Sequence, residues 1–96
     1  MHTVLWTINV NEGTSKQDIL QEIKASERAC KGVPGLIRTY FAVTADIKSV
    51  VEIYLWQSRS EAEQFFTRHW EAELARRWQS APTSRQDWET PLVVEG

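Results

Sequence analysis

Hydrophobic side chains follow two different spacings along this chain. They recur at about every second position, with β-branched and aromatic residues enriched, in residues 3–10, 36–44, 50–56 and 85–94. They recur at intervals of three and four in residues 15–30 and 58–79, the second stretch with a break near Thr67. The first spacing is typical of strands and the second of amphipathic helices. The predicted order is therefore strand, helix, strand, strand, helix, strand.

Short local signals support these boundaries. Ser58 and Glu61 have the spacing of a capping box, which predicts the start of the second helix. Thr14 and Ser15 are both possible N-caps of the first helix. Pro91 lacks a backbone N–H, so it predicts a bulge or an edge position within the last strand.

Two split β-α-β units in this order predict an α+β fold, a ferredoxin-like βαββαβ sandwich with a four-stranded antiparallel sheet. We expect one domain spanning residues 1–96, with both helices on one face of the sheet. Yet both alternating sets of strand residues are apolar: Tyr54 and Trp56 would lie on one face, Ile53 and Leu55 on the other. An uncovered apolar sheet favours aggregation, so we expect two copies to pack face to face as a homodimer.

Composition excludes several classes of partner. The net charge is −2 and the basic residues are scattered, which argues against nucleic acid. Apolar runs are far shorter than a bilayer span, and the N-terminus has no signal-peptide pattern, so no membrane role is expected. A single cysteine, Cys30, cannot form an internal disulfide, which favours the cytoplasm. Five tryptophans are unusual in 96 residues and indicate an aromatic core or an aromatic site.

Three segments carry a resemblance to a known superfamily: residues 34–38 (PGLIR) before a strand, residues 53–59 (IYLWQSR) at a strand–helix junction, and residues 89–94 (ETPLVV). Together they resemble the dimeric α+β barrel proteins, in particular the YdhR-like monooxygenases, relatives of the antibiotic-biosynthesis monooxygenases. The similarity covers nearly the whole chain. Relatives usually have two glycines before the Ile-Tyr-Leu-Trp run, whereas this chain has Val51 and Glu52, which fill that space.

The resemblance implies a cofactor-independent monooxygenase that acts on a small aromatic, phenolic or quinol-type molecule. No zinc-ligand spacing, phosphate loop or dinucleotide fingerprint is present, so neither metal nor cofactor is expected. The superfamily also includes heme-degrading enzymes, isomerases, cyclases and proteins without a known reaction. A heme-degrading enzyme and a non-catalytic small-molecule-binding or structural dimer therefore remain alternatives.

Candidate site residues come mainly from the second and third strands. We assume parity between the two strands, meaning that even-numbered residues of the second strand lie opposite even-numbered residues of the third. One sheet face then carries five polar or aromatic side chains: Arg38, Tyr40, Glu52, Tyr54 and Trp56. They would either line a cavity or lie at the seam between two copies. In the second case, Arg38 and Glu52 would form an ion pair at the dimer rim.

The proposed chemistry needs a base, oxyanion donors and an aromatic wall. His69 is a natural proton acceptor near neutral pH, and its predicted helix face points to the sheet. Tyr54 or Arg38 would hold the oxyanion. The predicted substrate-binding residues are Trp56, Tyr40, Phe65, Phe66, Asn9 and Glu52. Each of three candidates also has an ordinary structural interpretation. Trp56 could simply fill the core, His69 could be a structural residue of the helix, and Asn9 could be a residue at the end of a strand.

Overall fold

The computed structural model describes all residues of the chain, Met1–Gly96. The element order is that of a ferredoxin-like α+β fold, with the second helical stretch divided into two helices. The elements are β1 (His2–Asn9), α1 (Lys16–Cys30), β2 (Leu36–Val43), β3 (Ser49–Trp56), α2 (Arg59–Phe65), α3 (Arg68–Trp78) and β4 (Pro82–Glu89). The predicted fold class is confirmed.

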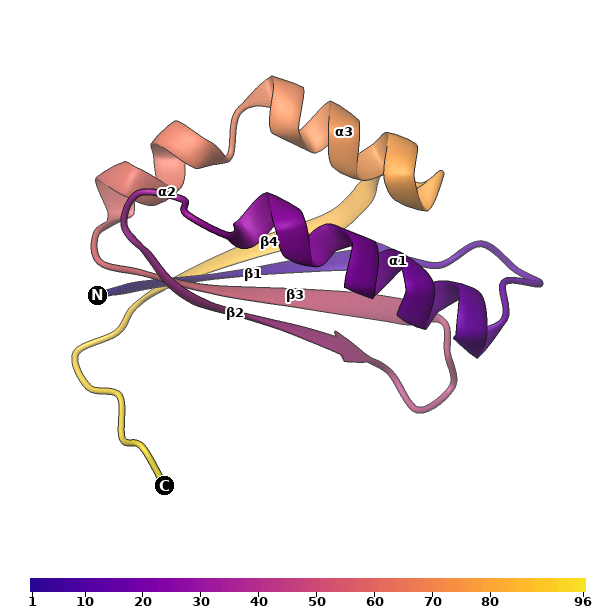
Figure 1. The fold of residues 1–96 in the computed structure, drawn as a ribbon, viewed down its shortest axis with the longest axis horizontal. Helices are drawn as coiled ribbons and strands as arrows, with labels where there is room; N and C mark the ends of the chain where they lie inside the picture. Colours follow the sequence, from indigo (N-terminus) through magenta and orange to yellow (C-terminus); the bar gives the residue numbers. More distant parts are fainter.

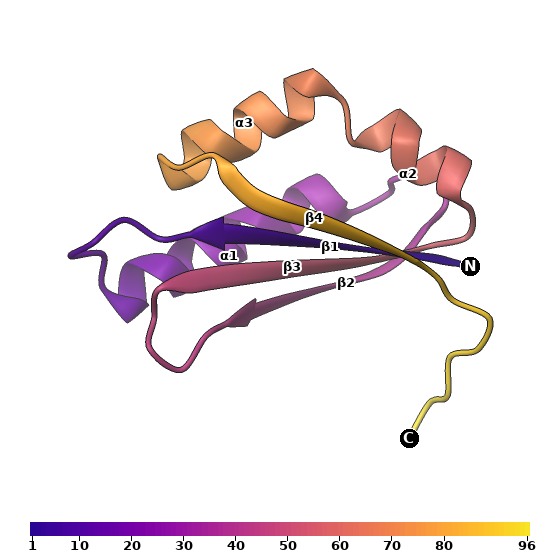
Figure 2. The ribbon, with the colours of Figure 1, turned by 180° about the vertical axis from the view of Figure 1, so that it is seen from behind.

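The four strands form one antiparallel sheet in the order β2-β3-β1-β4. All three helices cover one face of it, as Figures 1 and 2 show from opposite sides. We call this the helix side and the uncovered face the open side. The C-terminal segment, residues 90–96, leaves the sheet and extends away beyond the open side (Figure 1). None of the helices is both long and apolar enough to cross a lipid bilayer.

Local capping explains where the helices begin. Of the two possible N-caps of α1, Ser15 is used: its Oγ accepts from the amide of Asp18 at 3.1 Å. Ser58 caps α2 by accepting from the amide of Glu61 at 3.3 Å, so the predicted capping box marks the correct position. Thr67 interrupts the second helical stretch and caps α3. The predicted break is confirmed.

The last strand differs from its predicted range of residues 85–94. It begins at Pro82, ends at Glu89, and is followed by a segment without strand pairing. Two causes act together. The neighbouring strand β1 begins at His2, so the last ladder bond available is from the amide of Thr90 to the carbonyl of Met1. Pro91 then has no N–H to donate.

The pairing register decides which side chains face the helices. Glu52 lies opposite Trp6 of β1 and Phe41 of β2, and all three side chains point to the helix side. Tyr40 instead lies opposite Ile53, and Arg38 opposite Leu55. The predicted single face is therefore wrong for Arg38 and Tyr40, which lie on the open side. The loop between β2 and β3 aligns even-numbered residues of one strand with odd-numbered residues of the other.

The hydrophobic core lies between the helices and the sheet. Its buried residues alternate along β1 and β3, and two of them, Leu74 and Trp78, are four residues apart on α3. The core comprises Val4, Trp6, Ile8, Ile19, Val50, Tyr54, Trp56, Ala62, Phe66, Leu74 and Trp78. On the open side, by contrast, Tyr40 and Trp88 remain about half exposed.

The turn before β2 requires a glycine at position 35. Gly35 has φ +79°, in the left-handed region, and its carbonyl accepts from the amide of Gln57 at 2.8 Å. A Cβ atom there would lie 1.6 Å from Oε2 of Glu61. Gly32 has a similar φ of +71° but nothing within 4 Å of its Cβ position.

This pair of glycines gives a matched stability test. Gly32→Ala is expected to lower the free energy of unfolding by about 1–2 kcal/mol, the cost of a left-handed non-glycine residue. Gly35→Ala is expected to lower it further, because the Glu61 side chain must also move. Urea unfolding followed by tryptophan fluorescence measures both. Equal losses for the two variants would show that the contact between Gly35 and Glu61 contributes nothing.

Candidate active site between the helices and the sheet

A carboxyl group lies at the centre of the helix–sheet interface. Glu52 is completely buried, at 0% exposure. Its Oε1 accepts a hydrogen bond from the Tyr54 hydroxyl at 2.7 Å. Its Oε2 is buried without any hydrogen-bond partner. A buried carboxylate with one unpartnered oxygen is strongly disfavoured, so burial favours the neutral, protonated form of this group.

The surroundings shift the pKa values of the hydrogen-bonded pair Glu52 and Tyr54. Burial raises the pKa of Glu52 above its ordinary value, while the hydrogen bond from Tyr54, the positive charge of Arg77 and the nearby indole N–H of Trp78, which does not reach hydrogen-bond geometry, act in the opposite direction. Burial and the neighbouring Glu52 carboxyl raise the pKa of Tyr54 as well. The tyrosine therefore remains a hydrogen-bond donor, and Glu52 is the member of the pair that can exchange a proton.

Four further polar atoms in this interface lack partners. They are Thr39 Oγ1 and the indole nitrogens of Trp6, Trp56 and Trp78. We call these four residues, together with Glu52 and Tyr54, the buried polar layer. Unpartnered buried polar groups are few in native proteins, and each calls for an explanation. Here three N–H donors, a hydroxyl and a carboxyl share one interface, where water or a ligand with several oxygens could bond to them.

Aromatic rings pack against one end of the buried polar layer. The Tyr54 ring lies 5.0 Å from Phe66 and 6.2 Å from Phe65, measured between centroids. Trp56 lies 5.4 Å from Phe65, and Trp70 lies 4.6 Å from Phe66. Most of these pairs meet edge to face or at a tilt, the favoured arrangements. Trp56, Phe65 and Phe66 are in direct contact with one another, and their predicted role in substrate binding stays a prediction.

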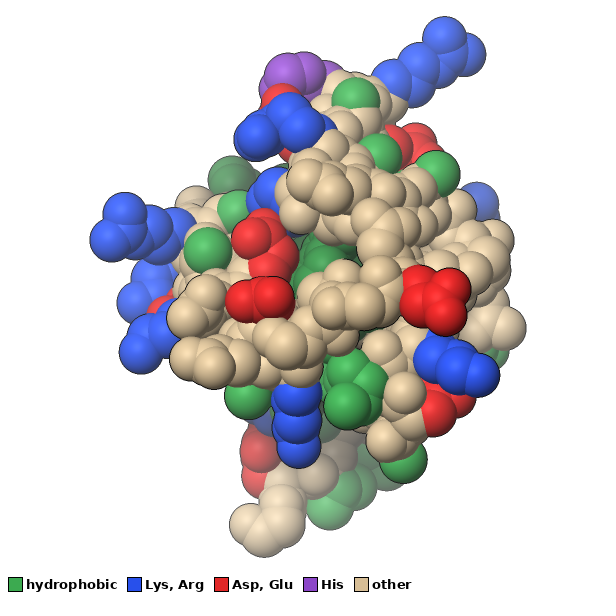
Figure 3. Space-filling model, turned by 90° about the vertical axis from the view of Figure 1, so that its right-hand side faces the viewer, with side chains coloured by type: hydrophobic (Ala, Val, Ile, Leu, Met, Phe, Trp, Pro, Cys, Tyr) green, Lys and Arg blue, Asp and Glu red, His purple; other side chains and the backbone are tan.

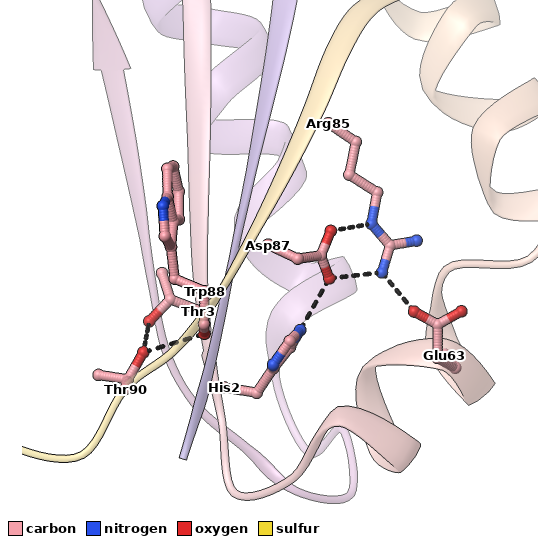
Figure 4. A network of polar contacts seen from close by, with 7 residues as sticks. All are labelled: His2, Thr3, Glu63, Arg85, Asp87, Trp88 and Thr90. Carbon is pink, nitrogen blue, oxygen red and sulfur yellow. Dashed lines mark hydrogen bonds and ion pairs between the residues drawn. The ribbon is translucent and has the colours of Figure 1, made fainter.

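A charged network closes the interface on the β4 side, as Figure 4 shows. Arg85 Nε and Nη2 donate to the two carboxylate oxygens of Asp87 at 2.8 and 3.0 Å, and Nη2 also reaches Glu63 of α2. His2 Nε2 lies 2.7 Å from Asp87 Oδ2. Partial burial alone would raise the pKa of Asp87, but the bonds from Arg85 and His2 lower it.

The Arg85 guanidinium also lies over two rings of the interface. Its central carbon is 5.4 Å from the Trp6 centroid and 5.3 Å from that of Phe66. Cation–π attraction therefore adds to the ion pairs in holding this side chain in place. Substrate access from the β4 side would require breaking this network.

The surface cavities reach the buried polar layer from other directions. At the end of the molecule shown in Figure 3, hydrophobic side chains are visible inside a hollow bordered by acidic groups. A cavity of about 310 Å³ between the β1–α1 connection and the helices is lined by Glu22, Arg77 and Trp78, among others. A second cavity, of about 370 Å³, includes Cys30, Thr39 and Phe41. Trp56, Tyr54 and His69 line neither of these two cavities nor the three at the N-terminus, along α1 and beside the β2–β3 loop.

His69 does not point toward the sheet. Its side chain is exposed on α3, whereas Trp70 and Leu74 face the interface. The predicted orientation of the histidine is therefore wrong, because α3 begins anew at Thr67 and sets its own helical phase. Its catalytic role remains a prediction without support from its position.

The remaining predicted residues divide between the two sides of the sheet. Asn9 is exposed at the end of β1 and accepts from Ser49 Oγ at 3.1 Å, so it occupies a strand end away from the aromatic rings. Arg38, on the open side, donates to the Tyr40 hydroxyl at 3.2 Å and pairs with Glu95 rather than with Glu52. The expected ion pair between Arg38 and Glu52 is therefore absent from the protomer.

Several residues of the interface were not among the predicted site residues. Trp6 could have been found from its alternation with Val4 and Ile8, and Trp78 from its four-residue spacing to Leu74. Thr39 gives no sequence signal, because its role depends on the register of β2. No group of three or more His, Cys, Asp or Glu side chains is placed to hold a metal ion.

Comparison with known proteins gives matches in structure rather than in sequence. No family model and no curated protein matches the chain. Solved structures do match over nearly its full length. A MhuD variant with two manganese protoporphyrin IX molecules per active site has a TM-score of 0.74 at 17% identity, covering 100% of both chains.

Two oxygenases are similar to the same extent. SnoaB, a cofactor-independent oxygenase from Streptomyces nogalater, has a TM-score of 0.71 at 12% identity and covers 99% of this chain and 97% of its own. The monooxygenase from the gene ActVA-Orf6 of Streptomyces coelicolor, in complex with nanaomycin D, has a TM-score of 0.71 at 14% identity, covering 99% and 91%. These likenesses establish the fold, and the predicted resemblance to antibiotic-biosynthesis monooxygenases is confirmed at that level.

The raised pKa of Glu52 has a consequence for stability. The folded protein retains this proton to a higher pH than the unfolded chain, whose glutamate pKa is about 4.3. The free energy of unfolding should therefore fall as pH rises from about 4.3 through the pKa of the folded state. The loss is about 1.4 kcal/mol for each pH unit that separates the folded-state pKa from the unfolded-state pKa. Glu52→Gln removes this loss.

We expect Glu52→Gln to be more stable than the wild type at pH 8, with the difference shrinking at pH 4. Urea unfolding at the two pH values measures it. Glu12 is exposed and forms no ion pair, so Glu12→Gln serves as the control. It should have the stability of the wild type at both pH values. If the stability of Glu52→Gln relative to wild type is instead lower at pH 8 than at pH 4, the folded protein favours the charged form of Glu52.

Proposed function

We propose that this protein is a cofactor-independent monooxygenase that oxidises a small phenolic or quinol-type aromatic substrate. The observation that carries the proposal is the Glu52 carboxyl, fully buried among aromatic rings with one oxygen unpartnered. The fold it shares with SnoaB and the ActVA-Orf6 monooxygenase supports the same reaction class. The bound groups of those structures are theirs, and for this chain the substrate class is our inference.

The first step is removal of a proton from the substrate. A carboxylate at Glu52 accepts the phenolic or enolic proton on Oε2, while the Tyr54 hydroxyl holds Oε1 at 2.7 Å and fixes its orientation. The raised pKa of Glu52 makes it a stronger base than an ordinary carboxylate and brings it closer to neutral pH. Indole N–H groups of the buried polar layer then stabilise the oxyanion.

The oxygen step needs no further group from the protein. The electron-rich anion transfers one electron to O2, giving superoxide and a substrate radical, and the two recombine with formation of a carbon–oxygen bond. The resulting peroxide takes up a proton and loses water, which leaves a new carbonyl on the ring. One oxygen atom enters the product and the other leaves as water. Glu52 returns the proton that it accepted.

The experiment compares two candidate bases. Oxygen uptake and quinone absorbance are measured with a panel of hydroquinones and anthrones. Glu52→Gln is expected to lower kcat about 10²–10⁴-fold, the usual contribution of a general base, with little change in KM. His69→Ala is expected to retain wild-type kcat, because its side chain is exposed on α3.

Other outcomes identify the alternatives. If His69→Ala loses activity and Glu52→Gln retains it, His69 rather than Glu52 is the general base. The direct aromatic packing in the interface favours the second candidate, a non-catalytic dimer that binds aromatic molecules, and absence of oxygen uptake with every substrate would select it. A Soret complex upon hemin titration would indicate the heme-degrading alternative instead.

We also propose that the protein is a cytoplasmic homodimer in which two open sides pack together. Leu5 and Ile53 form an apolar strip on this side, beside the already buried Leu55 and flanked by the half-exposed Tyr40 and Trp88. Four strands of eight residues give a face of roughly 500 Å² in projection, close to the lower limit of roughly 600 Å² per partner in stable interfaces. Residues 90–96, which carry the exposed Leu92 and Val94, would enlarge it.

A charge in the middle of this strip should separate the copies. Ile53→Glu is expected to convert a dimer of about twice 11.1 kDa into a monomer at 10 μM, measured by sedimentation equilibrium. Leu20→Glu places the same charge at a half-exposed position on α1 and should leave the dimer intact. A wild-type mass of one subunit would exclude the homodimer.

A further inference from the structure

One surface cavity differs in chemistry from the others. It lies between the C-terminal half of α1 and the outer strand β2, with a volume of about 370 Å³. Five of its ten lining residues are hydrophobic, whereas the other four cavities have at most two each. Small-molecule sites typically have volumes of about 300–1,000 Å³, mainly apolar walls and a few polar groups. With half of its lining residues hydrophobic, this cavity comes nearer to that description than the other four.

The inner wall of this cavity reaches the buried polar layer. Thr39 lines it, and the hydroxyl of this residue is buried without a partner. Thr39 lies directly opposite Tyr54 in the pairing of β2 with β3, on the helix side. Phe41, also in the wall, lies directly opposite Glu52. Opposite residues on one sheet face have Cβ atoms about 4.5–5.5 Å apart, so the wall is one side chain away from the Tyr54–Glu52 pair.

The charges around the cavity are unequal. Two cationic side chains line it, Lys24 and Lys31, against a single acidic one, Glu27, while Arg38 borders it with its side chain on the open side. Lys31 lies 3.8 Å from Glu27, and Arg38 is paired with Glu95. Lys24 forms no ion pair, so one positive charge at the entrance remains uncompensated. That charge favours a ligand with a single negative group.

We propose that the cavity between α1 and β2 admits the aromatic substrate, and that this substrate carries one acidic group, such as a ring carboxylate, held at the entrance by Lys24. The apolar wall formed by Ile23, Leu36 and Phe41 packs against the ring. The hydroxyl end of the substrate then lies toward Thr39 and the Tyr54–Glu52 pair. This inference rests on the proposed function for the identity of the reacting group, but the binding site itself does not depend on it.

The test uses two probes that differ by one carboxylate, 1,4-dihydroxynaphthalene and 1,4-dihydroxy-2-naphthoate. Binding to the full chain is measured without oxygen by calorimetry. We expect the wild type to bind the naphthoate at least ten-fold more tightly than the neutral quinol. Lys24→Gln should abolish that preference while leaving affinity for the neutral quinol within two-fold. Lys16→Gln, on the same helix but outside the cavity, should bind both probes like the wild type.

A second variant tests the inner wall. Thr39→Val keeps the shape but removes the unpartnered hydroxyl, and we expect at least five-fold weaker binding of both probes. Equal affinity for the two probes in the wild type, or an unchanged preference in Lys24→Gln, would overturn the inference. Oxidation of the neutral quinol that still depends on Glu52 would then leave the proposed function standing. Naphthoate binding that depends on Lys24, without any oxygen uptake, would support the cavity and reject the reaction.

Discussion

The burial of a carboxyl group at position 52 is the constraint around which this interface is organised. Strand β3 places Glu52 between Trp6 and Phe41 on the face that the helices cover. Burying a charge without full pairing is unfavourable, and replacing it with an apolar group is often neutral or stabilising. The protein partly compensates with the Tyr54 hydrogen bond and the nearby charge of Arg77. It leaves the second carboxylate oxygen unpartnered, which is the property expected of a reacting group.

The sequence was sufficient for the fold because local signals and periodicity agree. Ser58 and Glu61 marked the start of α2, and alternation along β3 placed Tyr54 and Trp56 together on one sheet face. The site was less predictable for two geometric reasons. The register of β2 from Arg38 to Val43 is set by the loop to β3, which pairs even-numbered residues with odd-numbered ones, so the assumed parity did not hold there.

The second reason concerns helical phase. A continuous helix from position 58 would allow either His69 or Trp70 on the apolar stripe, but the break at Thr67 resets the phase and gives this place to Trp70. Neither a strand register nor a helical phase across a break is visible in the order of residue types alone. Contacts between residues distant in the sequence determine the strand register and the helical phase. In this structure they place Arg38, Tyr40 and His69 away from Glu52.

The two sides of the sheet consequently serve different purposes. The side beneath the helices concentrates the buried acid, the aromatic rings and the unpartnered donors. The open side carries Ile53 and the half-exposed Tyr40 and Trp88, which are suited to contact with another surface. A protein in which the sheet had only a structural role would gain stability by replacing Glu52 with an apolar residue of similar volume. The carboxyl instead faces Tyr54, whose strand neighbour Thr39 lines a half-apolar cavity, and in the proposed reaction this burial prepares Glu52 to accept a proton from a bound aromatic molecule.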